Sequence, residues 1–280
     1  MIQKNVLVTS AGVATAVNVI SALRSSMKYR CCITSADMNK DSAGLYLSDN
    51  HYVTPSAESL NFFDNLKEII EKDNIDFIFP LHSSEIEFFA ENKKQLNDLG
   101  VGVTIPDKSV VNRCNNKDQF ELFLQENGFI YPKTYKNKEA IDNYPVFIKQ
   151  KVGSSSKNAY KVNSEEILEF YINGKEDKYI IQEYIDWHEI TIDCYVNKNY
   201  KLVGYVPRFR LKVKDGKSVV AKTMYDQHVF EQTKNLLENL NFTGACNIQM
   251  FYKDGETKII EVNPRLSAGG LPLATRAGVN

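Results

Sequence analysis

Short apolar runs alternate with helix-like segments along the opening third of the chain, and this alternation restricts the fold more than any other feature. After the first run, Val17, Ile20 and Leu23 recur at the spacing of one helix face. The runs expected to form strands are residues 6–8, 31–34, 77–79 and 101–105. Because strands that alternate with helices assemble into parallel sheets, we expect a Rossmann-like α/β domain over residues 1–115.

The pattern changes in the middle of the chain, where apolar positions begin to alternate singly with polar ones. Ile190 and Ile192 belong to a run of this kind, which is typical of a strand with one buried face. A hairpin is expected around Asp254 and Gly255, since this pair favours a tight turn. The sequence therefore predicts an α+β domain over residues 116–280.

Charge and cysteine content exclude several classes of partner. The chain has 280 residues and a formal net charge of −1 with interspersed charges, so no basic face for nucleic acid or acidic lipid is expected. No apolar stretch reaches the roughly 20 residues that span a bilayer. The five cysteines are odd in number and form no CxxC pair, which is typical of reduced thiols in a cytoplasmic protein.

The residues best suited to bind a metal ion flank the expected hairpin turn. Gln249 precedes the turn, and Glu261, Asn263 and Arg265 follow it. Their oxygen donors suit Mg²⁺, while Arg265 can hold a phosphoryl group. Gln249 faces Glu261 only if the turn has an odd residue count, for example three residues with a bulge, and a two-residue turn weakens the idea. An ordinary solvated hairpin face is the alternative.

The stretch from Glu261 to Arg265 resembles the metal-binding signature of the ATP-grasp enzymes, especially the carbamoyl-phosphate synthase large chain and its short relatives. Residues 244–249 resemble the strand that supplies a further metal ligand in that branch. The resemblance covers nearly the whole chain and implies ATP with one or two Mg²⁺ ions, or Mn²⁺, as cofactors. It also implies that Gln249, Glu261 and Asn263 bind the metal and that Arg265 steadies the reacting phosphate.

The same resemblance predicts how the chain is divided. Residues 1–115 would form the pre-ATP-grasp domain and residues 116–280 the ATP-grasp domain. The latter would consist of a lid at about 116–183 and a large subdomain at about 184–280. Relatives usually extend past the position of Asn280, so we expect the sequence to be truncated at its C-terminal end. A homodimer is common in this family.

A cation and a serine loop together suit the binding of phosphates. Lys149 ends an apolar strand, and Ser154, Ser155 and Ser156 follow in a small loop whose hydroxyls and backbone N–H groups can donate to phosphate oxygens. A surface turn is the alternative interpretation. By resemblance, Lys149 contacts adenine and the inner phosphates, and Lys117 is the lysine that opens the ATP-grasp domain.

The segment from Gln182 to Glu189 resembles the family's hinge between lid and large domain. A nucleotide needs an acceptor for its adenine amino group, backbone partners and a carboxylate for its ribose. Glu183 would supply the acceptor and Glu189 the ribose carboxylate, while Tyr184 and Ile185 would supply backbone groups. Exposed strand residues are the alternative interpretation.

Two further groups of residues suit ligand binding. Arg208 and Arg210 share one face of a strand, so both guanidinium groups can point at one anion. The resemblance implies that an arginine here reaches the outer phosphate or the substrate carboxylate, and a solvated basic strand is the alternative. Residues 82–85 follow an expected strand at the end where α/β proteins bind ligands, although Glu85 can equally cap the next helix.

The residues and the resemblance predict an ATP-dependent ligase that activates a small carboxylate as an acyl phosphate for attack by an amine. Two alternatives stay open, namely a bicarbonate-activating enzyme like carbamoyl-phosphate synthase and a non-catalytic ATP-binding protein. A nicotinamide enzyme is disfavoured, because Gly12 alone remains of the G-x-G-x-x-G turn that such enzymes need.

Overall fold

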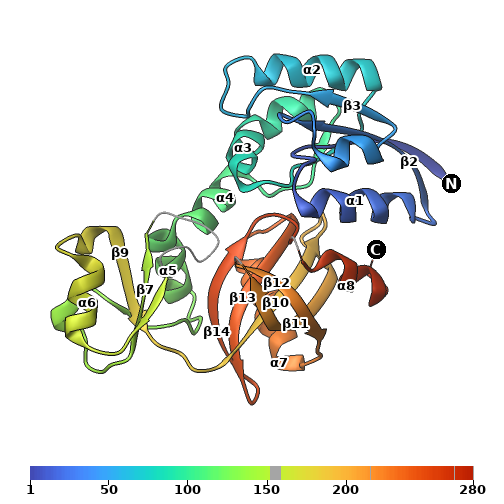
Figure 1. Cartoon of the computed structure of the whole chain (residues 1–280). Coiled ribbons are helices and arrows are strands. Elements are labelled where there is room, and N and C mark those ends of the chain that lie inside the picture. The colour runs from blue at the N-terminus through green and yellow to red at the C-terminus, as the bar shows by residue number, and fades with distance from the viewer. Residues whose placement is uncertain (152–158, 215, 268, 280) are drawn as a thin grey trace.

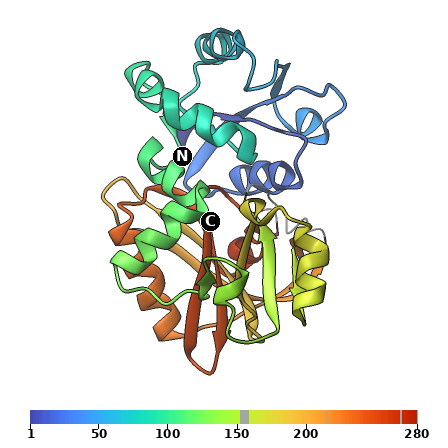
Figure 2. The same ribbon diagram turned by 90° about the vertical axis from the view of Figure 1, so that its left-hand side faces the viewer.

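The strands of the chain form three sheets, which follow one another along the sequence. The computed structural model describes residues 1–151, 159–214, 216–267 and 269–279. The N-terminal sheet lies at one end of the molecule, and the two other sheets lie together at the other end (Figures 1 and 2). Among the described helices, none is both long and apolar enough to cross a membrane.

The N-terminal sheet confirms the predicted parallel α/β arrangement. Its strands are β1 (Ile2–Val8), β2 (Tyr29–Asp37), β3 (Asn50–Val53), β4 (Phe77–Phe79) and β5 (Gly102–Val103), in the spatial order β3-β2-β1-β4-β5 with parallel pairing throughout. The chain adds β2 and β3 on one side of β1 and then crosses to add β4 and β5 on its other side, so the order of the strands reverses between β1 and β4. This switch point is where ligands bind in open α/β sheets.

Helices cover both faces of the N-terminal sheet, and this explains why its strands are apolar without alternation. Val6 and Val8 pack with α1 (Ala14–Arg24) on one face, whereas Leu7 packs with α2 (Phe62–Asp73) and α3 (Ser83–Asp98) on the other. The short 3-10 helix η1 (Ala43–Leu47) joins β2 to β3. The core therefore has two apolar layers with the sheet between them.

The second sheet is antiparallel and packs against one helix. Its order is β6-β9-β7-β8, and its members are β6 (Thr134–Tyr135), β7 (Val146–Gln150), β8 (Tyr160–Val162) and β9 (Tyr179–Glu183). Val146, Ile148 and Val162 are buried against Leu168 of α6 (Glu165–Ile172). The short 3-10 helices η2 (Lys138–Ala140) and η3 (Glu176–Lys178) complete this layer. Since alternate residues face opposite sides, Lys149 points away from α6.

The third sheet is antiparallel, with one apolar and one polar face. Its order is β12-β11-β10-β13-β14, and its members are β10 (His188–Val196), β11 (Leu202–Lys214), β12 (Lys217–Thr223), β13 (Gly244–Lys253) and β14 (Glu256–Asn263). Ile190, Ile248 and Val262 on the apolar face pack with Phe120 and Leu237. Phe120 belongs to helix α5 (Lys117–Glu126) and Leu237 to helix α7 (Gln227–Asn239). Two further helices are α4 (Lys108–Asn115) and α8 (Leu271–Arg276).

The hairpin between β13 and β14 has a two-residue turn, and a bulge changes its register. Asp254 and Gly255 form the turn with φ of 50° and 89°, so that Lys253 pairs with Glu256. The register shifts between Gln249 and Met250, and Ile260 is the extra residue. The condition of a turn with an odd residue count is therefore not met, but the bulge supplies the same change of parity and brings Gln249 opposite Glu261.

Candidate functional site

Three polar side chains predicted to bind metal meet on the polar face of the third sheet. Because of the bulge, Gln249 lies directly opposite Glu261 on the neighbouring strand. Oε1 of Glu261 accepts hydrogen bonds from Nε2 of Gln249 at 2.6 Å and from Nδ2 of Asn263 at 2.8 Å. Sequence reasoning thus identified a real cluster.

The donor set of this cluster fits a hard cation, provided the amide groups turn. Both amides present nitrogen to Glu261, and rotation of each by 180° would present oxygen instead. Oε1 of Gln249 already accepts from Nη1 of Arg210 at 2.7 Å, so a metal bound to that oxygen would displace the arginine. With one carboxylate, the site leaves room for phosphate oxygens. Among the residues the structure describes, no three His, Cys, Asp or Glu side chains form an alternative metal site.

The carboxylate of Glu261 interacts electrostatically with three cations that come from separate parts of the fold. Burial lowers the pKa of Lys149, and the carboxylate of Glu261 opposes that shift while the neighbouring Lys117 adds to it. Burial likewise lowers the pKa of Lys117 and of Arg265, again opposed by Glu261. Nζ of Lys117 donates to the backbone oxygens of residues 150 and 151 at 3.0 and 2.9 Å. The arrangement concentrates positive charge where a polyphosphate could lie.

Arg208 and Arg210 lie on this same polar face, but each already pairs with a carboxylate. Nε of Arg208 donates to Asp193 at 2.8 Å, and its side chain is only 3% exposed. Nη1 of Arg210 donates to Glu189 as well as to Gln249. Among the residues that the structure describes, one buried nitrogen of each guanidinium has no hydrogen-bond partner, namely Nη1 of Arg208 and Nε of Arg210. Two strand arginines therefore keep unused donors.

The residues predicted to bind the nucleotide base form the connection between the second and third sheets. Oε1 of Glu183 accepts from Nζ of Lys258 at 2.6 Å and from the backbone N–H of Lys133 at 2.9 Å. The ring of Tyr184 lies under Nζ of Lys161, 4.0 Å from the ring centroid. Oε1 of Glu183, whose carboxylate was predicted to accept from adenine, thus already accepts two hydrogen bonds from within the protein.

The remaining predicted residues are placed as follows. Gln182 donates from Nε2 to Oγ1 of Thr134 at 2.9 Å, and Ile185 is partly buried in the hinge. Burial raises the pKa of Glu189, and Arg210 opposes the shift while Glu261 adds to it, so this carboxylate lies close to the metal-binding candidates. Residues 154–156, the predicted phosphate loop, lie outside the described residues.

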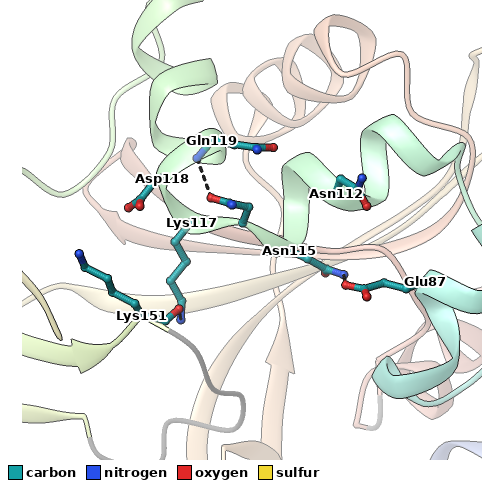
Figure 3. A pocket seen from close by; sticks show the side chains of 8 residues that line it. Glu87, Asn112, Asn115, Lys117, Asp118, Gln119 and Lys151 are labelled. Carbon is teal, nitrogen blue, oxygen red and sulfur yellow. Dashed lines mark hydrogen bonds between the residues drawn. The ribbon is translucent and has the colours of Figure 1, made fainter. Parts of the chain in front are cut away.

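A solvent-open cavity of about 510 Å³ lies where α5 begins (Figure 3). Lys117 and Lys151 line it together with Glu87 and Asn115, and Oδ1 of Asn116 caps the helix by accepting from the N–H of Gln119 at 3.0 Å. The cavity therefore adjoins one of the cations near Glu261. Its lining is polar and amide-rich, which suits a hydrated ligand better than an apolar one.

Sequence reasoning missed the partners that hold the predicted residues in place. Asp193 pairs with Arg208, and Lys258 pairs with Glu183. Ser267 lies within 3.4 Å of Nη2 of Arg208 and accepts the N–H of Gly270 at 2.9 Å. The alternation of polar and apolar residues along its strand could have indicated that Asp193 faces the same side as the candidate site. The contacts of Lys258 and Ser267 depend on the tertiary arrangement, which no local pattern specifies.

Two family models match this chain. Residues 175–280 match the model described as ATP-grasp in the biosynthetic pathway with Ter operon, and residues 6–104 match the model of the PylC-like N-terminal domain. Together with the sheet topology, these matches confirm the predicted fold class: a parallel N-terminal domain followed by an ATP-grasp fold.

Known proteins are similar over most of the chain at low identity. The carbamoyl phosphate synthase large chain of Methanobrevibacter smithii is 26% identical over 262 residues, which cover 82% of this chain and 24% of that protein. Biotin carboxylase from Campylobacter jejuni superposes with a TM-score of 0.76 at 15% identity, covering 98% of this chain and 67% of that one. The L-amino acid ligase from Bacillus licheniformis superposes with a TM-score of 0.69 at 16% identity, covering 97% of this chain and 68% of that one. The chain thus spans about a quarter of the curated relative.

Proposed function

Since this chain carries an ATP-grasp domain behind a PylC-like N-terminal domain, we propose that it is an ATP-dependent carbon–nitrogen ligase. It activates a small carboxylate as an acyl phosphate, which an amine then attacks. The observation that carries the proposal is the single carboxylate of Glu261, whose charge acts on Lys117, Lys149 and Arg265. The amino acid ligase and carbamoyl phosphate synthase names of similar proteins support it.

The residues divide the work of phosphoryl transfer by position and charge. Arg265 holds the terminal phosphoryl group, and Lys149 and Lys117 add charge beside the inner phosphates. Glu261 and Asn263, with Gln249 once Arg210 releases its oxygen, would hold Mg²⁺, which neutralises charge on the phosphates when bound. A carboxylate oxygen of the substrate attacks the terminal phosphorus and ADP leaves. The amine nitrogen then attacks the acyl carbon, phosphate leaves, and the nitrogen loses a proton.

The roles of the other predicted residues follow from where they lie. Tyr184 and Ile185 offer backbone groups to adenine, with Glu183 fixed beside them by Lys258. Glu189, which pairs with Arg210 near Glu261, would accept the ribose hydroxyls. The spare nitrogens of Arg208 and Arg210 are donors for the outer phosphate or the substrate carboxylate. The serines of the loop at residues 154–156 would cover the phosphates.

Mg²⁺-dependent release of ADP in the presence of hydroxylamine tests the proposal. Pools of amino acids, other small carboxylates and bicarbonate are scanned, because hydroxylamine converts an acyl phosphate into a stable hydroxamate. We expect one pool to stimulate ADP release and to yield hydroxamate, with both lost in Glu261→Ala. Glu256→Ala, which removes an exposed carboxylate at the start of the same strand, is the matched control and should leave both signals intact.

Other outcomes separate the alternatives. Stimulation by bicarbonate alone, which forms no stable hydroxamate, would indicate an enzyme that activates bicarbonate, as the names of the curated relatives suggest. Binding of Mg-ATP without ADP release from any pool would contradict the ligase and indicate a non-catalytic ATP-binding protein. We also propose a cytoplasmic location, supported by five free cysteines, together with homodimer formation and tolerance of Mn²⁺ in place of Mg²⁺.

A further inference from the structure

Arg210 connects the residue proposed to bind ribose with one of the residues proposed to bind metal. Its side chain is 6% exposed and reaches from β11 across the neighbouring strand β10 to β13, on the polar face of the third sheet. Nη1 donates to Glu189 of β10 and, at 2.7 Å, to Oε1 of Gln249 of β13. Nη2 donates to the backbone oxygen of Gly216 at 2.9 Å. One nitrogen atom, Nη1, thus contacts two groups that the proposed function assigns to different ligands.

The contact with Arg210 fixes how the amide group of Gln249 is turned. A guanidinium group can only donate hydrogen bonds, so Gln249 must direct its oxygen to Arg210. The amide nitrogen then faces the carboxylate of Glu261, to which it donates at 2.6 Å. Rotation of the amide by 180° would bring two donors, Nε2 of Gln249 and Nη1 of Arg210, against each other. While Arg210 stays in place, Gln249 therefore directs N–H groups, and not its oxygen, at the position beside Glu261.

Charge opposes a metal ion at this position for the same reason. The guanidinium group stays positively charged, and a buried charge is screened little from a neighbouring cation. Besides burial, which raises the pKa of Glu189, the charges of Arg210 and Glu261 act on this carboxylate in opposite directions. Arg210 therefore lies close to the carboxylates that would attract a divalent cation, and it neutralises part of their charge.

A nucleotide offers replacement partners on both sides of this contact. Ribose hydroxyls are donors, and in the proposed function they bind the carboxylate of Glu189, which accepts from Arg210 in this structure. The phosphates are acceptors, and Nε of Arg210 is a buried donor that has no partner among the described residues. A bound nucleotide therefore competes with Arg210 for Glu189 and supplies the arginine with an anion. Both effects weaken the contact between Arg210 and Gln249.

We propose that Arg210 couples the binding of the metal ion to the binding of the nucleotide. It keeps the oxygen of Gln249 turned away from the metal position until ribose hydroxyls replace it at Glu189. The proposal rests on the proposed function for the positions of ribose and metal, and it adds how the two positions regulate each other. Because coupling between two ligands is reciprocal, the metal ion must raise the affinity for the nucleotide by the same factor.

Binding of Mn²⁺ to the full chain tests the proposal without turnover, since the electron-paramagnetic-resonance signal of the free ion is lost on binding. We expect Arg210→Met to bind Mn²⁺ about fivefold or more tightly than the wild type when no nucleotide is present. Lys212→Met is the matched control, because it removes an equal charge at an exposed position of the same strand. It should change the affinity by less than about twofold. Undiminished binding in Glu261→Ala would contradict the proposal, because the ion would then lie elsewhere.

Two nucleosides test the same coupling on the wild-type chain, where no substitution can disturb folding. Adenosine has the ribose hydroxyls but no phosphate that would itself chelate Mn²⁺, and its dideoxy analogue lacks these hydroxyls. We expect adenosine at saturation to tighten Mn²⁺ binding by about fivefold or more, and the dideoxy analogue to leave it unchanged. In Arg210→Met neither nucleoside should alter the affinity for Mn²⁺. Circular dichroism checks that this variant is folded.

The outcomes separate this coupling from the ligase. Equal Mn²⁺ affinity of the wild type and folded Arg210→Met, or equal effects of the two nucleosides on the wild type, would overturn the coupling and leave the ligase untouched. Hydroxamate formation by the wild type decides the ligase, because it does not depend on the affinity of the nucleotide-free chain for Mn²⁺. Absence of hydroxamate together with the expected Mn²⁺ affinities would contradict the ligase and keep the coupling.

Discussion

Replacement of Glu85 by glutamine should remove a pH-dependent loss of folding stability. Burial raises the pKa of Glu85 from the ordinary 4.5 to about 7, because its carboxylate is removed from water. The hydroxyls of Thr9 and Ser10 oppose this shift, whereas the charge of Asp37 adds to it. A backbone hydrogen bond from His82, the N-cap residue of the same helix, also opposes the shift.

The sign and size of the effect follow from the two protonation equilibria. Below pH 4.5 the folded and unfolded chains both carry the proton on this carboxyl group. As the pH rises from 4.5 towards 7, the unfolded chain releases its proton while the folded chain keeps it, so stability falls. Over that interval, at about 1.4 kcal/mol per pH unit, the loss amounts to about 3 kcal/mol and is complete above pH 7.

Urea unfolding at a series of pH values measures this loss. The free energy of unfolding of Glu85→Gln minus that of the wild type should rise by about 3 kcal/mol between pH 4.5 and pH 8, because glutamine stays neutral. Glu87→Gln makes the same change at an exposed position of the same helix and should give a flat difference. A difference for Glu85→Gln that varies by less than about 0.5 kcal/mol over this range would refute the reasoning.

Three further substitutions test the packing around the sites. Lys258→Met removes the ion pair with Glu183, whose side chains are 20% and 28% exposed; we expect a thermal-unfolding cost of about 1 kcal/mol or less, and a much larger cost would contradict a partly solvated pair. In Gly270→Ala the new Cβ would lie 1.9 Å from Oδ2 of Asp193, so urea unfolding should show a loss of about 1–3 kcal/mol, and unchanged stability would argue against this close approach. Phe242→Ala empties a fully buried position and should cost about 3–5 kcal/mol in the same assay, whereas a cost below about 1 kcal/mol would mean that the core closes around the gap.

The N-terminal fold could be predicted because its signal is local. Val6, Leu7 and Val8 are all buried, as helices lie on both faces, and a continuous apolar run records this directly. The strand β12 gave no such signal. Val219 and Val220 are both about half exposed at the edge of the third sheet, so no period-two pattern of burial marks the strand.

The metal-binding candidates could be predicted as a group, but their surroundings could not. Glu261 and Asn263 share a face at any register, since they are two residues apart on one strand. The pairing of Arg210 with Glu189 depends instead on how β10 and β11 align, which no local pattern specifies. The contact between Lys258 and Glu183 joins residues 75 positions apart on separate sheets, and it requires the complete fold.

The bulge at Ile260 reverses which residues of the strand face the core and which face the opposite side. Before it, odd-numbered positions such as Ile259 point into the core, whereas after it the even-numbered Val262 does so. Lys258 and Glu261, three residues apart, therefore face the same side, so that one strand contacts both Glu183 of β9 and Gln249 of β13. Any insertion or deletion between them must change the length by an even number of residues, or the strand would present its carboxylate to the core.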